Sequence, residues 1–202
     1  MLNQLGKIGT GTAVGAVTAL LGLQWRNPLN VLIGIGAMVP GPQAGALTTA
    51  GAVLSGIHLL SLDPKVEEFP SQTFGPGAAI GSCRVTVENP KNAGELRPVT
   101  VQGSLDEVTA KVEDWIKGDA MGRTALLRKE ENVQGASGKP ANYLHSRHVS
   151  LVFSFADDVF IRITDQGGNK CLVEYQGQLR FGGGDLGVNA ARAKRMYDAI
   201  SA

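Results

Sequence analysis

Two histidines and two adjacent aspartates are the side chains best suited to acid–base chemistry: His145, His148, Asp157 and Asp158. A histidine held by a carboxylate can transfer protons near neutral pH. Each pair lies in a strand-like segment, where residues one or three apart point to opposite faces. This argues against joint metal binding by the histidines, and the aspartates cannot act as a facing acid–base pair. His145 could form an acid–base pair with Asp157 or Asp185 if the fold joined them, but surface or hydrogen-bonded histidines are far commoner.

A glycine-rich run, Leu179–Asn189, follows the last strand-like segment and precedes a C-terminal helix. Glycines before a helix can cradle a phosphate. This run lacks the lysine and hydroxyl residue of a phosphate loop, and Asp185 would repel phosphate. We therefore expect a structural turn in which Asp185 or Asn189 caps the helix and Arg180 can pair with Asp185. The predicted structural motif is Arg180, Gly182, Asp185, Gly187 and Asn189.

The serines and cysteines indicate no catalytic or metal-binding site. Ser150 and Ser154 have no nucleophile-elbow context, so acyl transfer has no support. Cys83 and Cys171 are single and far apart in sequence, so they pair only if the fold brings them together. No His/Cys cluster has zinc-ligand spacing. The sequence assigns no catalytic residue and no metal ligand, and it leaves cofactor-binding residues unknown.

Charge divides the chain near Asp63. Residues 1–62 carry only two formal charges, Lys7 and Arg26, whereas residues 63–202 carry 17 basic and 18 acidic side chains. The second part is near neutral and has no basic patch of the kind that nucleic-acid binding needs. We predict three regions: an apolar arm over 1–62, an extended connector over 63–96, and a globular domain over 97–202.

The arm contains two uncharged segments, Ile8–Trp25 and Gln43–Leu62, separated by breaks at Arg26–Pro28 and Pro40–Pro42. A membrane-spanning helix needs ~20 apolar residues, so both are long enough, the first barely. Many positions are small, which favours close helix packing within or beside a membrane. The alternatives are soluble packing or a processed targeting segment. The predicted packing residues are Gly11, Gly15, Thr48, Ala52 and Gly56.

The globular domain reads as α+β. Ser104-Leu-Asp-Glu107 forms a capping box before a helix that ends near Gly118. Asp165–Asn169 reads as a hairpin turn, and 189–202 as a closing helix with Val188, Arg192, Met196 and Ile200 on its inner side. The order predicts an antiparallel, curved sheet with both helices on one face. The expected strands are Arg97–Gly103, Thr124–Glu130, Asn142–His148, Val149–Phe155, Val159–Thr164 and Cys171–Arg180.

Three motifs in this domain resemble the family called domain of unknown function 1499, over about residues 97–200. They are Tyr143-Leu-His145, Phe155-Ala-Asp-Asp-Val159 and Arg180–Asn189 with the basic helix after it. The chain departs from the family where many relatives carry a paired-cysteine motif, since only Cys83 remains. The resemblance implies apolar N-terminal segments and occurrence in bacteria, cyanobacteria and plastids. It implies no activity, because none is established for the family.

These observations predict a non-catalytic, membrane-associated accessory subunit of a larger membrane complex. Given where the relatives occur, we expect a plastid thylakoid with a photosystem-type partner; a bacterial inner membrane is the alternative. The expected partners are protein subunits and membrane lipid, with no nucleic acid. No cofactor of its own is predicted, beyond contact with a partner's lipid, chlorophyll or carotenoid. Two other hypotheses stay open: a lipid- or pigment-binding module with an apolar cavity under Asn189–Ala202, and a hydrolase-like enzyme using His145 and an Asp.

Overall fold

The computed structural model describes residues 9–24, 27–39, 41–60, 82–119, 123–135, 138–152, 155–180, 184 and 186–202. The chain forms two compact units. One comprises Met1–Asp63 with Val149–Ala156, and the other comprises Pro64–His148 with Asp157–Ala202.

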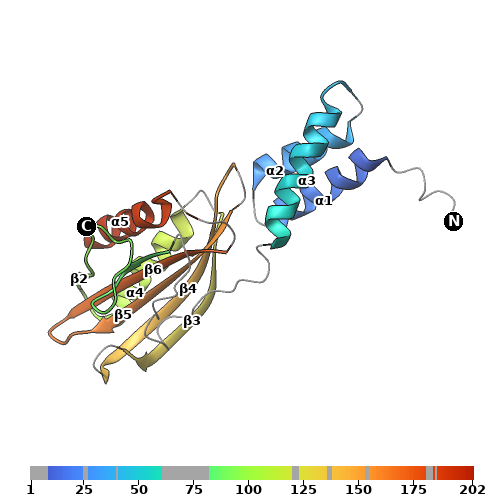
Figure 1. The fold of residues 1–202 in the computed structure, drawn as a ribbon. Coiled ribbons are helices and arrows are strands. Elements are labelled where there is room, and N and C mark those ends of the chain that lie inside the picture. The colour runs from blue at the N-terminus through green and yellow to red at the C-terminus, as the bar shows by residue number, and fades with distance from the viewer. Residues whose placement is uncertain are drawn as a thin grey trace. The chain divides into compact units, whose positions relative to one another are not determined.

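The N-terminal unit contains three helices: α1 (Thr10–Gln24), α2 (Pro28–Met38) and α3 (Ala44–Leu60). They pack against one another (Figure 1). Asn27 caps α2, because its Oδ1 accepts hydrogen bonds from the backbone N–H groups of Leu29 at 3.1 Å and Asn30 at 3.4 Å. Pro28 takes the first helical position, where its missing N–H costs nothing. No helix in the described part of the chain is long and apolar enough to cross a membrane.

Glycine allows the backbones of α1 and α2 to approach closely. A Cβ at Gly15 would lie 2.5 Å from Gly34 O, and one at Gly34 would lie 2.5 Å from Gly15 O. Gly15 therefore packs against the chain's own α2. Gly11 lies one turn earlier in α1. Between α1 and α3, Thr18 Oγ1 donates to Gly51 O at 3.0 Å.

The three small residues predicted to share a packing face on α3 lie away from this junction. Thr48 is half-buried, Ala52 is exposed, and a Cβ at Gly56 would meet no atom within 4 Å. The buried residues of α3 include Gly51, Leu54, Ser55 and His58. The Thr48–Ala52–Gly56 face is thus left for a contact outside the bundle, and that contact stays a prediction.

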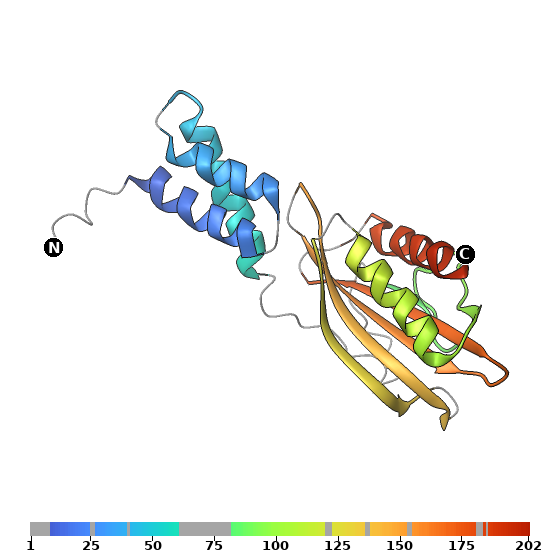
Figure 2. The same ribbon diagram turned by 180° about the vertical axis from the view of Figure 1, so that it is seen from behind.

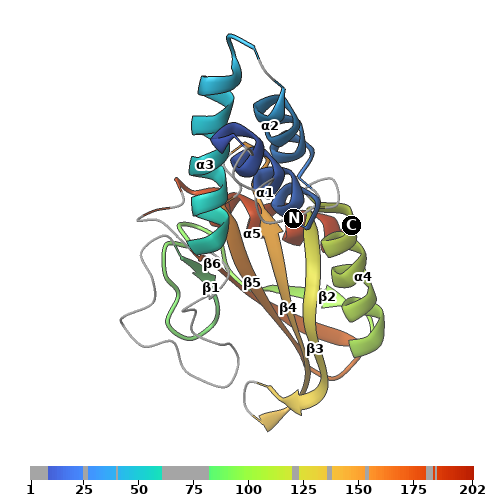
Figure 3. The same cartoon turned by 90° about the vertical axis from the view of Figure 1, so that its right-hand side faces the viewer.

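The C-terminal unit is an open antiparallel sheet with helices on one face, which confirms the predicted α+β class (Figures 1 and 2). The strand order is β1-β6-β5-β4-β3, and β2 also pairs with β6. Strands β3 to β5 curve side by side in Figure 3. The bounds are β1 Cys83–Val85, β2 Val99–Gln102, β3 Thr124–Gln134, β4 Pro140–Val149, β5 Ala156–Asp165 and β6 Lys170–Leu179, with helices α4 Leu105–Gly118 and α5 Val188–Ser201.

The capping box predicted at the start of α4 is present. Ser104 Oγ accepts from Glu107 N at 3.3 Å, and Ser104 N donates to Glu107 Oε2 at 2.8 Å. These two bonds satisfy backbone donors that a helix start otherwise leaves open. The apolar residues Val108, Val112 and Ile116 then fall on one buried face, which fixes α4 against the sheet.

The hydrophobic core lies between the sheet and the two helices. Val159, Ile161 and Ile163 of β5 face it, as do Met196 and Ile200 of α5. The predicted inner side of α5 is confirmed for Arg192, Met196 and Ile200, which are buried, but Val188 is 45% exposed. Side chains thus fill the space beneath α5.

The predicted strand Val149–Phe155 is wrong. Val149 ends β4, and the backbone then turns back into β5. Ser150 N donates to Phe155 O at 2.9 Å, and Phe155 N donates to Ser150 Oγ at 3.0 Å. A serine that closes a turn with its own hydroxyl competes with the strand ladder, and the alternating pattern does not reveal this. The turn predicted at Asp165–Asn169 is confirmed, with Gln166 N donating to Lys170 O at 2.8 Å.

Strand β3 forms one border of the sheet and is irregular. Its register against β4 shifts between Leu126 and Arg128, and again between Glu130 and Val133. Four successive charged residues, Arg128–Glu131, lie between or at these shifts.

Candidate functional site

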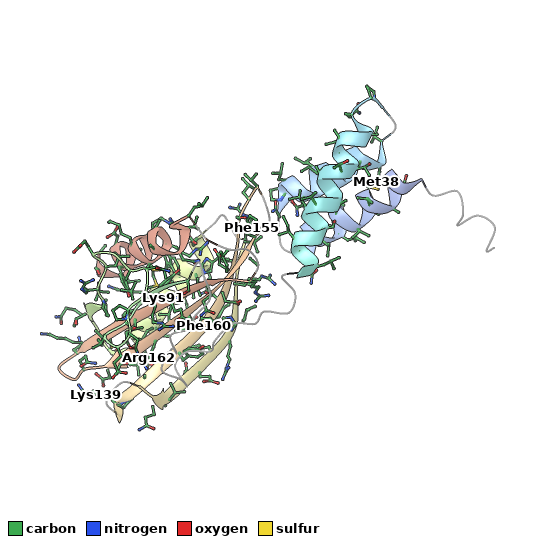
Figure 4. All side chains as sticks on the ribbon, viewed as in Figure 1. Met38, Lys91, Lys139, Phe155, Phe160 and Arg162 are labelled. Carbon is green, nitrogen blue, oxygen red and sulfur yellow. The ribbon has the colours of Figure 1, made fainter. Side chains whose placement is uncertain are left out.

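The sheet has two chemically different faces. Side chains alternate along β5, so Asp157, Val159 and Ile161 point toward the helices. The opposite side of the sheet, here called the far face, is polar, and Phe160 and Arg162 of β5 lie on it (Figure 4). Its aromatic and polar residues in β4, β5 and β6 include Tyr143, His145, Arg147, Asp158, Phe160, Arg162, Glu174, Gln176 and Gln178.

Asp158 is the centre of an ionic cluster on the far face. It is fully buried, and its Oδ1 lies 2.6 Å from His145 Nε2. Arg180 donates to both carboxylate oxygens, from Nε to Oδ2 and from Nη2 to Oδ1, each at 2.8 Å. Burial alone would raise the pKa of Asp158, but the hydrogen bonds from His145 and Arg180 outweigh it and hold the pKa below its usual value. Asp158 is therefore ionised.

Two aromatic rings, Phe160 and Tyr143, form a stack with His145. The His145 ring stacks on Phe160 with centroids 4.4 Å apart, and the rings of Tyr143 and Phe160 stack with centroids 6.3 Å apart. The His145 side chain is 17% exposed, so it is one of the places where this cluster reaches solvent. Arg147 is half-buried and interacts electrostatically with the same cluster. Burial and the charge of Arg180 lower the pKa of Arg147, whereas the charge of Asp158 raises it.

A second polar network lies on the helix side. Ser146 Oγ is 3.0 Å from His148 Nε2, and His148 Nδ1 is 3.0 Å from Asp119 Oδ2. These distances match a Ser–His–Asp triad. Ser146 and His148 are fully buried, however. The Trp115 and His148 rings lie with their centroids 5.4 Å apart. A nucleophile must reach its substrate, so this relay is a structural one.

Burial sets the charge state of His148. It lowers the pKa to about 4, against the opposing effect of the hydrogen bond to Asp119. His148 is thus neutral near pH 7. The sequence pattern missed this relay, although Ser146 and His148, two apart on a strand, necessarily share a face.

Asp157 is bound from α5 and has no part in the far-face cluster. Arg192 Nη1 donates to Asp157 Oδ2 at 2.8 Å and to Asn189 Oδ1 at 2.6 Å. Of the two predicted caps of α5, Asn189 does not hold the cap position, and Asp185 lies outside the described residues. The cap position is Gly187, with φ 81°, and it makes no side-chain capping bond. A positive φ is easy for glycine, which explains a glycine at this point.

The structure describes only some of the other residues of the predicted structural motif. Arg180 binds Asp158, a partner that the sequence did not suggest. Gly182 and Asp185 lie outside the described residues, so the predicted Arg180–Asp185 pair stays a prediction. His145 meets Asp158, not Asp157. The opposite orientations predicted for the two aspartates and for the two histidines are confirmed.

Cys83 and Cys171 are both buried, and neither forms a disulfide. Cys83 pairs in register with Gly177 of β6, and Cys171 lies six positions earlier on that strand. Six strand residues span about 20 Å, far beyond the Cα separation of a disulfide. The fold therefore excludes a bond between them.

No cluster of metal-ligating side chains is found among the described residues. No three His, Cys, Asp or Glu side chains in that part of the chain could hold a metal ion. The cavities lined by described residues include two in the C-terminal unit. One of about 580 Å³ borders the loop from Thr86 to Pro98, and one of about 220 Å³ borders Lys139, Arg162 and Glu174. The lipid- or pigment-binding alternative gains no support from either position.

Comparison with known proteins gives a family and two partial relatives. The chain is 27% identical over 145 residues to 1-deoxy-D-xylulose-5-phosphate synthase 1, chloroplastic, of Oryza sativa subsp. japonica, covering 63% of this chain and 20% of that protein. It is 27% identical over 139 residues to the protein of the same name from Cannabis sativa, covering 60% and 19%. The chain thus spans about a fifth of these relatives.

No solved structure matches the chain significantly. Residues 69–200 match the family described as "Protein of unknown function (DUF1499)". This range contains the far-face cluster, the buried relay, helix α4 and all but the last residue of α5. The chain belongs to the DUF1499 family.

Proposed function

We propose that the protein is a non-catalytic accessory subunit that associates with a membrane complex through its N-terminal helices. The observation that carries this proposal is the surface of α1–α3. Their described residues include no formally charged side chain. They nevertheless expose seven large aliphatic side chains: Val17, Leu20, Leu23, Leu32, Ile35, Val53 and Leu59.

This surface is unlike that of a helix bundle in water. A surface helix usually presents charged and polar residues on the side away from its core. Here Leu20 is 65% exposed and Leu32 is 66% exposed, on two different helices. Large exposed apolar areas mark contacts with proteins or membranes. The lack of charge favours an apolar lipid phase and the subunits within it over an aqueous partner.

The plastid thylakoid, with a photosystem-type partner, remains the specific setting that we propose. Two considerations support it: the distribution of relatives noted above, and the word chloroplastic in the names of both partial relatives. A bacterial inner membrane is the alternative. On this proposal the C-terminal unit is presented at the membrane and acts by binding rather than by catalysis.

Flotation of the intact chain with phosphatidylcholine vesicles tests the membrane proposal. Leu20→Glu with Leu32→Glu should abolish flotation, because two charges would enter the apolar phase. Leu126→Glu is the matched control, since this leucine is 40% exposed on β3 of the other unit, and it should float like the parent. A parent chain that remains in the aqueous fraction, or a double variant that still floats, would defeat the proposal.

A hydrolase-like enzyme is the second candidate, favoured by the 2.6 Å contact between His145 and Asp158. A carboxylate on one imidazole nitrogen orients the ring and leaves the other nitrogen for proton transfer. Turnover of an activated ester that disappears in His145→Gln but survives in His148→Gln would favour this candidate. Equal rates in parent and His145→Gln would remove it.

A further inference from the structure

The loop that joins β1 to β2 borders a cavity of about 580 Å³. Small-molecule sites in proteins have volumes of this order. Of the acids in this loop, Glu88 lines the smaller cavity and Glu95 is exposed, so neither is among the described residues that line the larger one. Those residues combine apolar, polar and basic side chains: Thr86, Val87, Pro90, Lys91, Asn92, Ala93, Gly94, Arg97 and Pro98.

Hydrogen bonds hold this loop in one shape. Arg84 N donates to Lys91 O at 2.7 Å, and Lys91 N donates to Arg84 O at 3.0 Å. Asn92 Nδ2 donates to Ser82 O at 2.7 Å, and Ala93 is buried in the hydrophobic core of the unit. The walls of the cavity are therefore formed before any ligand enters, which reduces the entropy cost of binding.

Arg97 lines this cavity with an oriented guanidinium group. Its Nη1 donates to Gly94 O at 3.0 Å and to Leu96 O at 2.8 Å. These are its polar contacts within the described chain, and no carboxylate there forms an ion pair with it. The two carbonyl groups orient the guanidinium without neutralising its charge, and the side chain is exposed. Its Nε and Nη2 donors match the paired oxygens of a carboxylate or phosphate.

The cavity also has apolar walls. Val87 is 64% exposed, and its backbone N–H donates to Glu174 Oε1 at 3.0 Å, which fixes its position. Pro90 and Pro98 add apolar surface whose backbone is held by the proline rings. Apolar walls with a few oriented polar groups are the usual composition of a site for a small organic molecule. An inorganic ion would leave these walls uncovered.

We propose that this cavity binds a small organic anion. Its carboxylate or phosphate group contacts Arg97, and its apolar body packs against Val87, Pro90 and Pro98. The site lies in the C-terminal unit and adds a ligand-binding role to the membrane association proposed for the helices.

Calorimetric titration of the intact chain at constant ionic strength tests the site with three probes: phenyl phosphate, benzoate and inorganic phosphate. At least one phenyl compound should bind with one-to-one stoichiometry and more tightly than inorganic phosphate, because only the phenyl compounds cover the apolar walls. The tighter of the two phenyl compounds identifies the preferred anionic group.

Two variants change the cavity in different ways. Arg97→Gln should weaken binding of the tighter probe about ten-fold or more, as expected for losing hydrogen bonds between charged groups. Val87→Glu should also weaken it, because a like charge then faces the anion. The exposure of Val87 lets the fold accept this change, so Val87→Glu tests the site even if Arg97→Gln disturbs the loop.

Each variant has a matched control in the same unit. Lys170→Gln removes one positive charge at the exposed start of β6, and Leu127→Glu adds an acid at a 45% exposed position of β3. Both should bind the probe as the parent does.

The proposal is overturned if the parent binds neither phenyl compound saturably, or if Arg97→Gln and Val87→Glu both bind as the parent does. Equal weakening in the control variants would also overturn it, because the effect would then be one of overall charge. Probe binding that depends on Arg97 in a chain that fails to float would refute only the membrane role, so the two proposals fail separately.

Discussion

Asp157 and Asp158 are neighbours in β5, yet each binds an arginine on a different face of the sheet. Asp157 Oδ2 accepts from Arg192 of α5 at 2.8 Å, and Asp158 accepts from Arg180 at 2.8 Å. The pair thus ties together the last helix, the end of β6 and the middle of the sheet. The two carboxylates differ in which other partners their arginines keep when the carboxylate charge is removed.

Asp158→Asn should destabilise the protein more than Asp157→Asn. Loss of the Asp158 charge leaves Arg180 beside Arg147 without that counter-charge, which typically costs about 3–5 kcal/mol for a buried pair. Arg192 keeps Asn189 Oδ1 at 2.6 Å and Asp119 at 3.9 Å when Asp157 is neutral. Urea unfolding of both variants measures the order. Equal losses, or the reverse order, would contradict the role given to Arg180.

His148 should make the protein less stable as the pH falls from about 6.5 to about 4. Its folded pKa of about 4 lies below the unfolded value of 6.5, so the unfolded chain binds the extra proton first. The shift corresponds to a loss on the order of 3 kcal/mol across this window. Below it, protonation of Asp119, whose pKa is also lowered despite burial, reduces stability further.

The measurement is the unfolding free energy at several pH values for the parent and for His148→Gln. The variant should lose most of the slope between pH 6.5 and pH 4. A parent whose stability is level across that window would show that His148 is already charged when folded.

Gly15→Ala and Gly56→Ala should have opposite effects on the helical unit. A Cβ at Gly15 would lie 2.5 Å from the Gly34 carbonyl oxygen, so α1 and α2 must separate, at a cost of roughly 1–3 kcal/mol. Gly56 has open space, and alanine there should stabilise α3 by up to about 1 kcal/mol. Thermal melts followed by circular dichroism check the signs. A neutral Gly15→Ala would mean that the close α1–α2 contact is not maintained in solution.

The two thiols should react slowly in the folded protein and rapidly after unfolding. Both are buried, and burial together with Asp165 raises the pKa of Cys171 to about 11, which suppresses the reactive thiolate. Timed labelling with a thiol reagent, with and without denaturant, measures this. A reducing agent should leave the melting temperature unchanged, because Cys83 and Cys171 lie too far apart to form a disulfide.

Local patterns predicted the parts of the fold that depend on neighbouring residues. Ser104 and Glu107 identify the start of α4, because both halves of the capping box are within one turn. Strand alternation correctly placed Asp157 and Asp158 on opposite faces. The turn after Val149 was missed because the Ser150 hydroxyl, and not a glycine or proline, closes it.

The candidate site depends on register across strands, which one sequence does not contain. Residues 13 and 22 positions away, His145 and Arg180, meet at Asp158 only because β4 and β6 flank β5 in a particular alignment. The unsatisfied amide of Gln178 is likewise invisible in the sequence, where a glutamine in a strand reads as a solvent-facing residue.

The irregular border strand β3 affects how two molecules of this protein meet edge to edge. Two register shifts interrupt its ladder, and Arg128, Lys129, Glu130 and Glu131 follow one another between them. A second molecule approaching this edge would meet hydrogen-bonding groups out of step and charges of both signs. Neighbouring molecules at high concentration are thus kept from joining their sheets through this edge.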